Sequence, residues 1–177
     1  MLTALPTLDA LLAAHAAALG DDAIGYRHHA YRVANFAWLL APGDADALEK
    51  LSIAVAFHDL GIWTAGTFDY LPPSRALART HLHATGRTDW GDEVDAMIDA
   101  HHRVRELPPG TQASVEVFRR ADWIDVSRGM RRFGLPRAVV REVIAAFPNA
   151  GFHRRLAMLT LQRWRRHPWD PLPMMRW

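Results

Sequence analysis

The sequence predicts an all-α fold, arranged as one domain over residues 1–177. Half of the residues are hydrophobic, and alanine is abundant while β-branched residues are sparse, a composition that favours helix over strand. Apolar residues recur at helical spacing between glycine, proline and aspartate breaks, and no segment alternates with the period of a strand. A chain of 177 residues is long enough to bury a full hydrophobic core, so we expect a helical bundle.

Three helices are predicted in the first third of the chain. Residues 8–19 form an alanine- and leucine-rich helix, which a glycine and two aspartates stop. Residues 24–40 carry apolar side chains at helical spacing up to a proline-glycine break. Residues 45–58 follow, with Asp44 or Asp46 as the N-cap. This third helix carries a run of apolar residues, Leu48, Leu51, Ile53, Ala54, Val55 and Phe57, so we expect it to be central.

The next segment, residues 62–73, contains a glycine and two prolines and is predicted to be irregular. It forms either a loop over the functional site or a connector packed by its own aromatic residues. Ser74 is a suitable N-cap for the helix that follows. The remaining predicted helices cover residues 74–85, 89–102, 111–127, 137–147 and 152–166. The tail, residues 168–177, is rich in proline and tryptophan and is predicted to be irregular, packing on the body or on a second subunit.

Composition argues against several classes of function. A net charge of +2 leaves no broad basic surface, so nucleic acid is not expected as a partner. The chain has no cysteine, which excludes disulfides and thiolate metal sites. No apolar run reaches the roughly 18 residues of a membrane span, and no basic residue precedes Arg27 as a signal peptide would require. We expect a soluble, cytoplasmic protein that does not bind membranes, and a homo-oligomer is one option for its assembly.

An apolar run at residues 54–63 is interrupted by His58 and Asp59, with Gly61 two residues later. An unpaired charge at the buried end of such a run is costly, and a divalent cation is a common partner for both side chains. Imidazole and carboxylate together suit Mn, Fe, Ni, Zn or Mg. Gly61 is predicted to adopt the left-handed conformation just past a helix end.

Four residues stand out as metal ligands: His29, His58, Asp59 and Asp122. They lie on three predicted helices. Each lies in a largely apolar stretch, where a titratable side chain is costly unless it has a partner. A metal ion bound between facing helices of a bundle would be such a partner. Adjacent residues of a helix point about 100° apart, so His58 and Asp59 can share an ion only near a helix end, where the sequence puts them.

Three short motifs, in this order, resemble those of the HD-domain superfamily of metal-dependent phosphohydrolases, in particular its small single-domain members. They are His29-x-x-Arg32-Val33, Ala56-Phe57-His58-Asp59-Leu60-Gly61 and Arg120-Ala121-Asp122. The resemblance covers about residues 24–130 and leaves the C-terminal helices and the tail, 136–177, outside the motif core. It implies an all-helical fold in which the four ligands hold one divalent cation, with His58 and Asp59 at the catalytic centre. Asp125, one helical turn after Asp122, is a candidate for contacting a ligand rather than the ion.

Some members of this superfamily hold two ions, with extra histidines between the His-Asp pair and the last aspartate. Four histidines of this chain are candidates for a second metal or for substrate: His81, His83, His101 and His102. In that arrangement Asp59 would bridge two ions. His101 and His102 are equally explained by the favourable interaction of histidine with the dipole at a helix C-terminus. The sequence is therefore compatible with either one or two bound ions.

The resemblance implies hydrolysis of a phosphomonoester or phosphodiester bond in a small phosphorylated metabolite, nucleotides included. A cation lowers the pKa of water, and cationic side chains assist the leaving oxygen. The phosphate-binding candidates are Arg32, Arg75 and Arg79, although each is also explained as a surface arginine, and Arg32 as the partner of a structural carboxylate. Two alternatives are a di-iron oxygenase on the same scaffold and a non-catalytic, metal-stabilised binding module.

Overall fold

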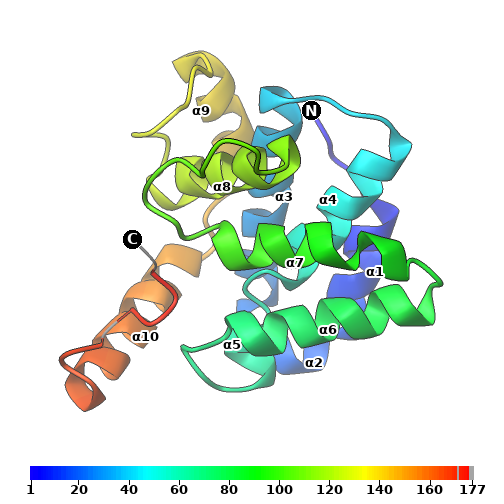
Figure 1. Cartoon of the computed structure of the whole chain (residues 1–177). Coiled ribbons are helices and arrows are strands. Elements are labelled where there is room, and N and C mark those ends of the chain that lie inside the picture. The colour runs from blue at the N-terminus through cyan, green and yellow to red at the C-terminus, as the bar shows by residue number, and fades with distance from the viewer. Residues whose placement is uncertain (171, 176–177) are drawn as a thin grey trace.

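The computed structural model describes residues 1–170 and 172–175, and all regular structure within them is helical, without a strand (Figure 1). The α-helices, in chain order, are α1 (Pro6–Ala14), α2 (Ala16–Leu19), α3 (Ala23–Leu40), α4 (Ala45–Phe57), α5 (Gly61–Thr64), α6 (Leu71–Ala84), α7 (Gly91–Ala100), α8 (Ala113–Val126), α9 (Arg137–Ala146) and α10 (Phe152–Arg166). Two short 3₁₀ segments, Gly20–Asp22 and Thr88–Trp90, precede α3 and α7. The predicted all-α bundle is confirmed.

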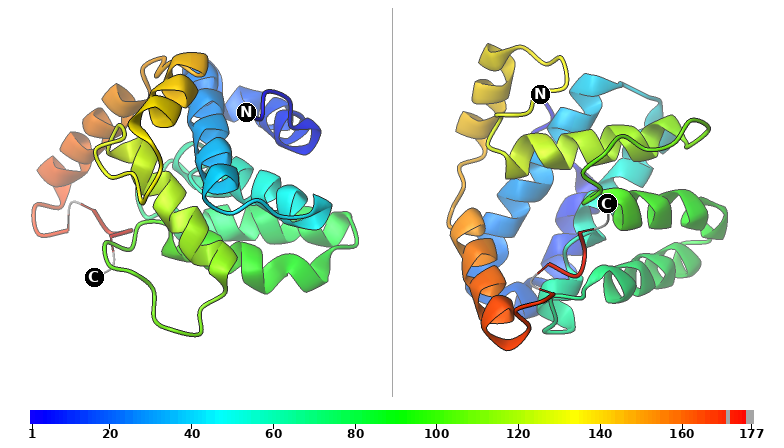
Figure 2. Two further views of the ribbon diagram at one scale, coloured as in Figure 1. Left: turned by 90° about the horizontal axis from the view of Figure 1, so that it is seen from above. Right: turned by 60° about the vertical axis from the view of Figure 1, so that its left-hand side comes forward.

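Helix α3 lies at the centre of the bundle. It packs against α8 on one side and α4 on the other, and it also contacts α9 and α10 (Figure 2). Its residues from Ala30 to Ala37 are all buried, which explains why this helix is apolar on most faces. Helices α6 and α7 run beside each other, and both pack against α4. Helix α1 also packs against α4. The functional residues therefore lie where α3, α4, α7 and α8 meet.

Most predicted helix bounds agree with the structure within a few residues, and Asp44 caps α4 by accepting a 2.8 Å hydrogen bond from the backbone N–H of Ala47. The predicted helix 8–19 is wrong in one respect, because it is broken at His15 into α1 and α2. His15 leaves helical geometry (φ −106°, ψ 11°), and its ring packs edge-on against Phe57 at 5.8 Å between ring centroids. The helix therefore breaks where His15 makes a tertiary contact, and no local sequence signal predicts that contact.

The segment predicted to be irregular, residues 62–73, is irregular in its middle, residues 65–70, and helical at both ends. Helix α5 covers its start, and α6 begins at Leu71, three residues earlier than predicted. The two prolines lie in the first turn of α6, where a missing backbone N–H leaves no hydrogen bond unmade. Ser74 is therefore inside α6 rather than its N-cap, and its hydroxyl accepts a 3.0 Å hydrogen bond from the N–H of Gly61.

The prediction for Gly61 is also wrong. This glycine is the first residue of α5 and does not have a positive φ angle. A Cβ atom at this position would lie 2.5 Å from the carbonyl oxygen of Tyr70 and 2.9 Å from the hydroxyl of Ser74. The position requires glycine because α5 and the start of α6 approach each other closely, immediately after the His-Asp pair.

None of the described helices combines the length and the apolar character needed to cross a lipid bilayer.

Candidate metal centre

The structure brings the four predicted ligands together, in a buried cluster between α3, the end of α4 and α8. The Nε2 atoms of His29 and His58 lie 2.8 Å apart. Asp59 Oδ2 lies 3.5 Å from His29 Nε2 and 3.6 Å from His58 Nε2. Asp122 Oδ1 lies 3.7 Å and 3.9 Å from the same two nitrogens. Residues that are distant in the chain thus direct two imidazoles and two carboxylates at one point.

Hydrogen bonds at the far side of each ring determine which nitrogen carries the proton. The Nδ1 of His29 lies 2.6 Å from Asp125 Oδ2, and the Nδ1 of His58 lies 3.0 Å from the carbonyl oxygen of Val55. Both partners can only accept, so each Nδ1 must donate, and in the neutral ring Nε2 then presents a lone pair. Two lone pairs at 2.8 Å repel each other unless a proton or a metal cation lies between them.

The donor atoms of His29, His58 and Asp59 lie within 4.8 Å of one another, close enough to hold a single metal ion, whereas Asp122 lies beside this group and is not part of it. Nitrogen and oxygen ligands lie about 2.0–2.2 Å from an ion such as Zn²⁺, so two ligands of one ion are at most about 4.3 Å apart. The distances between ring nitrogens and carboxylate oxygens, 3.5 to 3.9 Å, are inside this limit. Two carboxylates also match the charge of a divalent cation, whereas one shared proton would neutralise only half of their charge.

His101 extends the cluster on the other side of Asp59. Its Nδ1 donates to the carbonyl oxygen of Ile98 at 2.6 Å, and its Nε2 lies 3.4 Å from Asp59 Oδ1. Both of these facing atoms are buried, and neither has a hydrogen-bond partner among the described residues. Buried polar atoms without partners are costly, and a cation between them would satisfy both. His29, His58, Asp59 and His101 therefore form a buried cluster that can hold a metal ion.

Of the four extra histidines, the structure places two near the cluster and two away from it. Donor atoms of Asp59, His101 and His102 lie within 4.8 Å of one another. His81 instead packs against Phe57, with 5.9 Å between ring centroids, and His83 is exposed on α6. The prediction of His81 and His83 as ligands is thus not supported by their positions, because α6 directs them to Phe57 and to solvent.

Burial dominates the electrostatics of the cluster. It raises the pKa of Asp122 to about 7, although His101 and His29 act in the opposite direction. Burial also lowers the pKa of His58 to about 3. For His29 burial is opposed by hydrogen bonds to Asp125 and Asp59, which raise its pKa to about 9. Burial also opposes protonation of His101, but its interaction with Asp59 raises its pKa, so His29 and His101 are the cationic partners that the protein itself offers the carboxylates, and a metal ion would replace their protons.

Arg32 does not have the predicted role in phosphate binding. Its side chain is buried, and its guanidinium binds Asp125 through Nε and Nη2, the latter at 2.9 Å. It also donates to the carbonyl oxygen of Phe147 at 2.9 Å. Asp125 in turn accepts from His29 and does not approach the point at which the ligands meet. Arg32 therefore holds in place the carboxylate that orients His29. This agrees with the alternative given above, that Arg32 pairs with a structural carboxylate.

The other two arginines predicted to bind phosphate lie in ion pairs on the surface of α6 and α7. Arg75 binds Asp99 at 2.7 Å. Arg79 binds Asp92 at 2.6 Å and Asp95 at 3.0 Å. Since these carboxylates occupy both guanidinium groups, a role in substrate binding has no support in the structure.

Three aromatic residues complete the centre and were not predicted as part of it. The hydroxyl of Tyr70 is hydrogen-bonded to His102 Nε2, so the segment before α6 packs onto the site. Tyr70 also packs on Phe68 of the same segment, so both sequence-based expectations apply. Tyr26 stacks over His58 at 6.2 Å, and Phe152 stacks on the ring of His29 at 4.1 Å. Tyr70 lies in the same segment as the motif, but nothing in the sequence indicates that α10 contributes Phe152.

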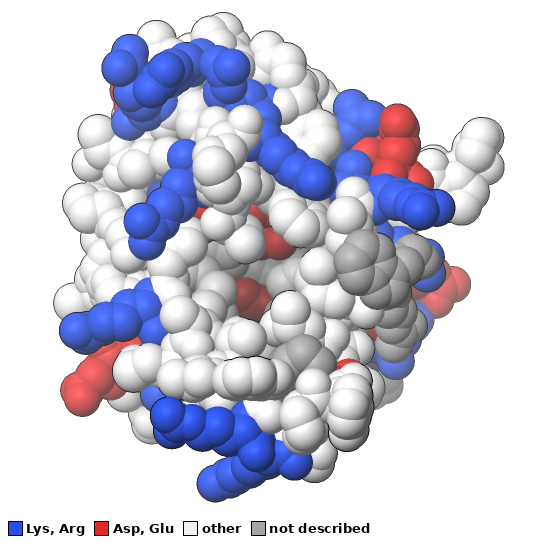
Figure 3. Space-filling view, turned by 90° about the vertical axis from the view of Figure 1, so that its left-hand side faces the viewer, with Lys and Arg blue, Asp and Glu red and all other residues white. Residues whose placement is uncertain are grey.

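On the side of the molecule where α10 lies the surface is hollowed, and Figure 3 shows acidic side chains at the floor of this hollow and lysine or arginine side chains around it. The side chains of Asp59 and Asp122 are 5% and 3% exposed, whereas those of His29 and His58 are fully buried. The carboxylates are thus the only members of the predicted ligand set with any contact to solvent among the described residues.

No family model, curated protein or solved structure matches this chain. The likeness to the HD-domain superfamily accordingly depends on the motif residues alone.

Proposed function

We propose that this protein is a metal-dependent phosphohydrolase of the HD type, which cleaves a phosphate ester in a small phosphorylated compound. The observation that carries the proposal is the pair of imidazole nitrogens 2.8 Å apart with two carboxylates beside them. That donor set suits a hard or borderline divalent ion such as Mn, Fe, Ni, Zn or Mg. The ordered motif around His29, His58, Asp59 and Asp122 supports the same assignment.

The residues of the chain would divide the work as follows. When bound, a divalent cation polarises the phosphoryl group and activates a water molecule for attack. His29, His58, Asp59 and Asp122 would hold this ion in place. His101 Nε2, which presents a lone pair 3.4 Å from Asp59, is placed to hold a proton or a second ion. Tyr70, hydrogen-bonded to His102 Nε2, would orient that imidazole beside Asp59.

Hydrolysis of an aryl phosphate tests this proposal. Asp59→Asn removes a charged ligand that faces His29, His58 and His101, so we expect at least about a 100-fold loss of activity, together with a loss of bound metal by elemental analysis. Asp69→Asn, an exposed carboxylate in the neighbouring segment, is the matched control and should retain both. Wild-type protein that retains its metal but hydrolyses none of a panel of phosphate esters would instead favour a non-catalytic binding module.

A di-iron oxygenase is the second candidate, and one observation favours it. Asp59 directs one oxygen to His29 and His58 and the other to His101, with His102 nearby, so it is placed to bridge two ions. Iron loading under air, followed by an optical spectrum and measurement of O₂ consumption, distinguishes the candidates. A hydrolase is expected to consume no O₂ while cleaving the aryl phosphate.

A further inference from the structure

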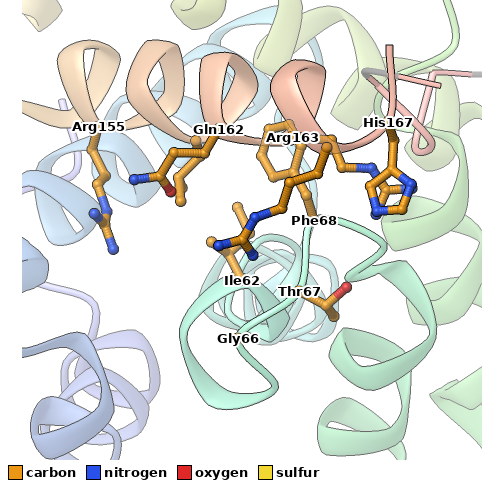
Figure 4. A pocket seen from close by; sticks show the side chains of 10 residues that line it. Ile62, Gly66, Thr67, Phe68, Arg155, Gln162, Arg163 and His167 are labelled. Carbon is orange, nitrogen blue, oxygen red and sulfur yellow. The ribbon is translucent and has the colours of Figure 1, made fainter. Parts of the chain in front are cut away.

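A second polar cavity lies between the C-terminal half of α10 and the segment that follows α5 (Figure 4). Its volume is about 350 Å³. Arg155, Gln162, Arg163 and His167 point from α10 and its C-terminus towards the opposite wall, which includes Thr67. We call this cavity the arginine pocket, after its lining residues Arg155, Arg163 and Arg166.

The arginine pocket has an excess of positive charge. Its described lining residues include three arginines and no carboxylate. Two of the arginines have partners outside the lining, since Arg155 binds Asp22 at 2.9 Å and Arg163 binds Asp170 at 2.9 Å. No ion pair involves Arg166 among the described residues, which leaves one full positive charge uncompensated.

The two ion pairs leave donors free for a ligand. Arg163 uses Nε and Nη2 on the backbone and side chain of Asp170, so its Nη1 group remains available. The side chain of Asp170 is 58% exposed, and an ion pair with such a partner is weak. Planar guanidinium groups match the oxygens of a phosphate and bind them in pairs. A cavity with three of them suits a doubly charged oxyanion better than a single carboxylate.

The wall of the arginine pocket adjoins the metal centre. Ile62, which lines the pocket, donates its backbone N–H to the carbonyl oxygen of Asp59 at 3.0 Å. Phe68, another lining residue, packs on Tyr70 with 6.1 Å between ring centroids. Tyr70 in turn binds His102. Residues that contact the metal ligands or their neighbours therefore form one side of the pocket.

We propose that the arginine pocket binds a second phosphoryl group of the compound whose phosphate ester is cleaved at the metal centre. This inference rests on the proposed function and narrows its substrate class to molecules that carry two separated phosphoryl groups. Arg163 and Arg166 would provide most of the binding, because their guanidinium groups lie in the pocket and retain free donors. Neither touches the reacting bond, so their role is substrate binding and specificity.

Calorimetric titration of the full-length protein with inorganic phosphate tests the pocket itself. The pocket variant Arg163→Gln/Arg166→Gln is compared with Arg154→Gln/Arg165→Gln, which removes the same charge from exposed positions of the same helix that do not line the pocket. We expect the phosphate Kd to rise at least about tenfold in the pocket variant and to stay unchanged in the control. Both double substitutions are also made in the Asp59→Ala protein. The Asp59→Ala substitution removes phosphate binding at the metal centre, so that the remaining phosphate binding reports on the pocket.

An unchanged Kd in the pocket variant, in both backgrounds, would overturn the assignment of a phosphate site. Should the double variant fold poorly in a thermal melt, Arg166→Gln alone serves, since this side chain is exposed and in no ion pair of the described residues. The single variant is expected to weaken phosphate binding measurably and to leave the melting temperature as in the wild type.

Steady-state kinetics test the link to the substrate. Each bisphosphate is compared with its monophosphate counterpart. In the wild type the preference is kcat/KM for the bisphosphate divided by kcat/KM for the monophosphate. We expect the pocket variant to lower this preference about tenfold, through a higher KM for the bisphosphate. The same ratio in wild type and pocket variant would refute the link. If the wild type hydrolyses neither compound, the proposed function and the substrate link both fail, whereas loss of phosphate binding in the pocket variant would still establish the pocket.

Discussion

Asp122 illustrates how burial determines the chemistry of a single ligand. Its carboxylate faces both imidazoles from α8, at 3.7 and 3.9 Å, and its side chain is almost fully buried. Removal from water disfavours the charged form, so its pKa rises to about 7. The same residue on the surface would be ionised throughout the physiological range. Here the proton and the metal compete for one oxygen.

This competition predicts how metal affinity depends on pH. A cation binds the ionised carboxylate, so below pH 7 it must displace the proton of Asp122, which should lower the affinity about tenfold per pH unit in addition to the proton that His29, with a pKa of about 9, loses over the whole range. Above pH 7 the contribution of Asp122 should disappear. Titration with Zn²⁺ or Mn²⁺ at several pH values measures the slope. In Asp122→Asn the affinity should be lower overall and its slope near pH 7 reduced; an unchanged slope would contradict the assignment.

Asp125 acts one step away from the metal, through His29. It accepts from His29 Nδ1 at 2.6 Å and binds Arg32, and these contacts lower its own pKa to about 2 despite burial. Removing such a partner of a metal-bound histidine costs about 10- to 100-fold in metal affinity. It also leaves the buried charge of Arg32 without compensation.

We therefore predict that Asp125→Asn weakens metal binding by about 10- to 100-fold and destabilises the fold by about 3–5 kcal/mol. Asp99→Asn breaks the partly exposed pair with Arg75 and is the control, with an expected cost below about 1 kcal/mol. Chemical denaturation and competition with a metal chelator provide the two measurements. A stable Asp125→Asn protein with normal metal affinity would show that His29 is oriented by other contacts.

At the scale of elements, the approach of α5 to α6 holds the His-Asp pair in place. Asp59 and Gly61 belong to one tight turn, and Gly61 donates its N–H to Ser74 on α6. The turn leaves no space for a side chain at Gly61, because a Cβ atom would lie 2.5 Å from the carbonyl oxygen of Tyr70. The backbone at that carbonyl cannot move without shifting Tyr70, which binds His102.

Gly61→Ala should consequently lower the free energy of unfolding by about 1–3 kcal/mol and reduce metal affinity as well, because α6 must move. Gly86→Ala is the comparison, since Gly86 has a φ of 69° but open space around the position of a Cβ. The comparison variant should lose about 1 kcal/mol to backbone strain and keep its metal. Equal metal affinity in the two variants would argue against coupling between this turn and the site.

For the molecule as a whole, the centre depends on helices from both halves of the chain. Helix α10 follows the motif residues in sequence, yet Phe152 at its start covers the ring of His29 at 4.1 Å and 14° between planes. The same helix carries the arginine pocket. The C-terminal region therefore contributes both to the shielding of a ligand and to the proposed recognition of substrate.

Phe152→Ala tests this dependence. Loss of a buried phenyl group typically costs about 3–5 kcal/mol, and here it would also expose one face of His29 to water. We expect a lower melting temperature together with weaker metal binding. Trp164→Ala removes an aromatic side chain that is 54% exposed on the same helix and should change neither. Normal metal affinity in Phe152→Ala would mean that α10 stabilises the fold without influencing the centre.

The sequence was sufficient to predict the fold class and most helices, because apolar spacing and glycine or proline breaks are local signals. It failed at His15, where α1 ends on packing against Phe57, and at residues 61–74, where prolines begin α6 instead of preventing a helix. The break at His15 arises from a contact between segments distant in the chain, about which local propensity contains no information. The start of α6 is a local preference of proline for the first helical turn, although we predicted a break there.

The sequence by itself singled out two histidines and two aspartates as a possible cation site, since titratable groups in apolar helices are costly without a partner. Only the tertiary structure decided which groups meet. It placed His101 beside the candidate ligands and His81 and His83 away from them. It also paired Arg32 with Asp125 and packed the start of α10 against His29. The physical reason is that helix type follows from neighbours along the chain, whereas the direction of a side chain depends on how whole helices pack.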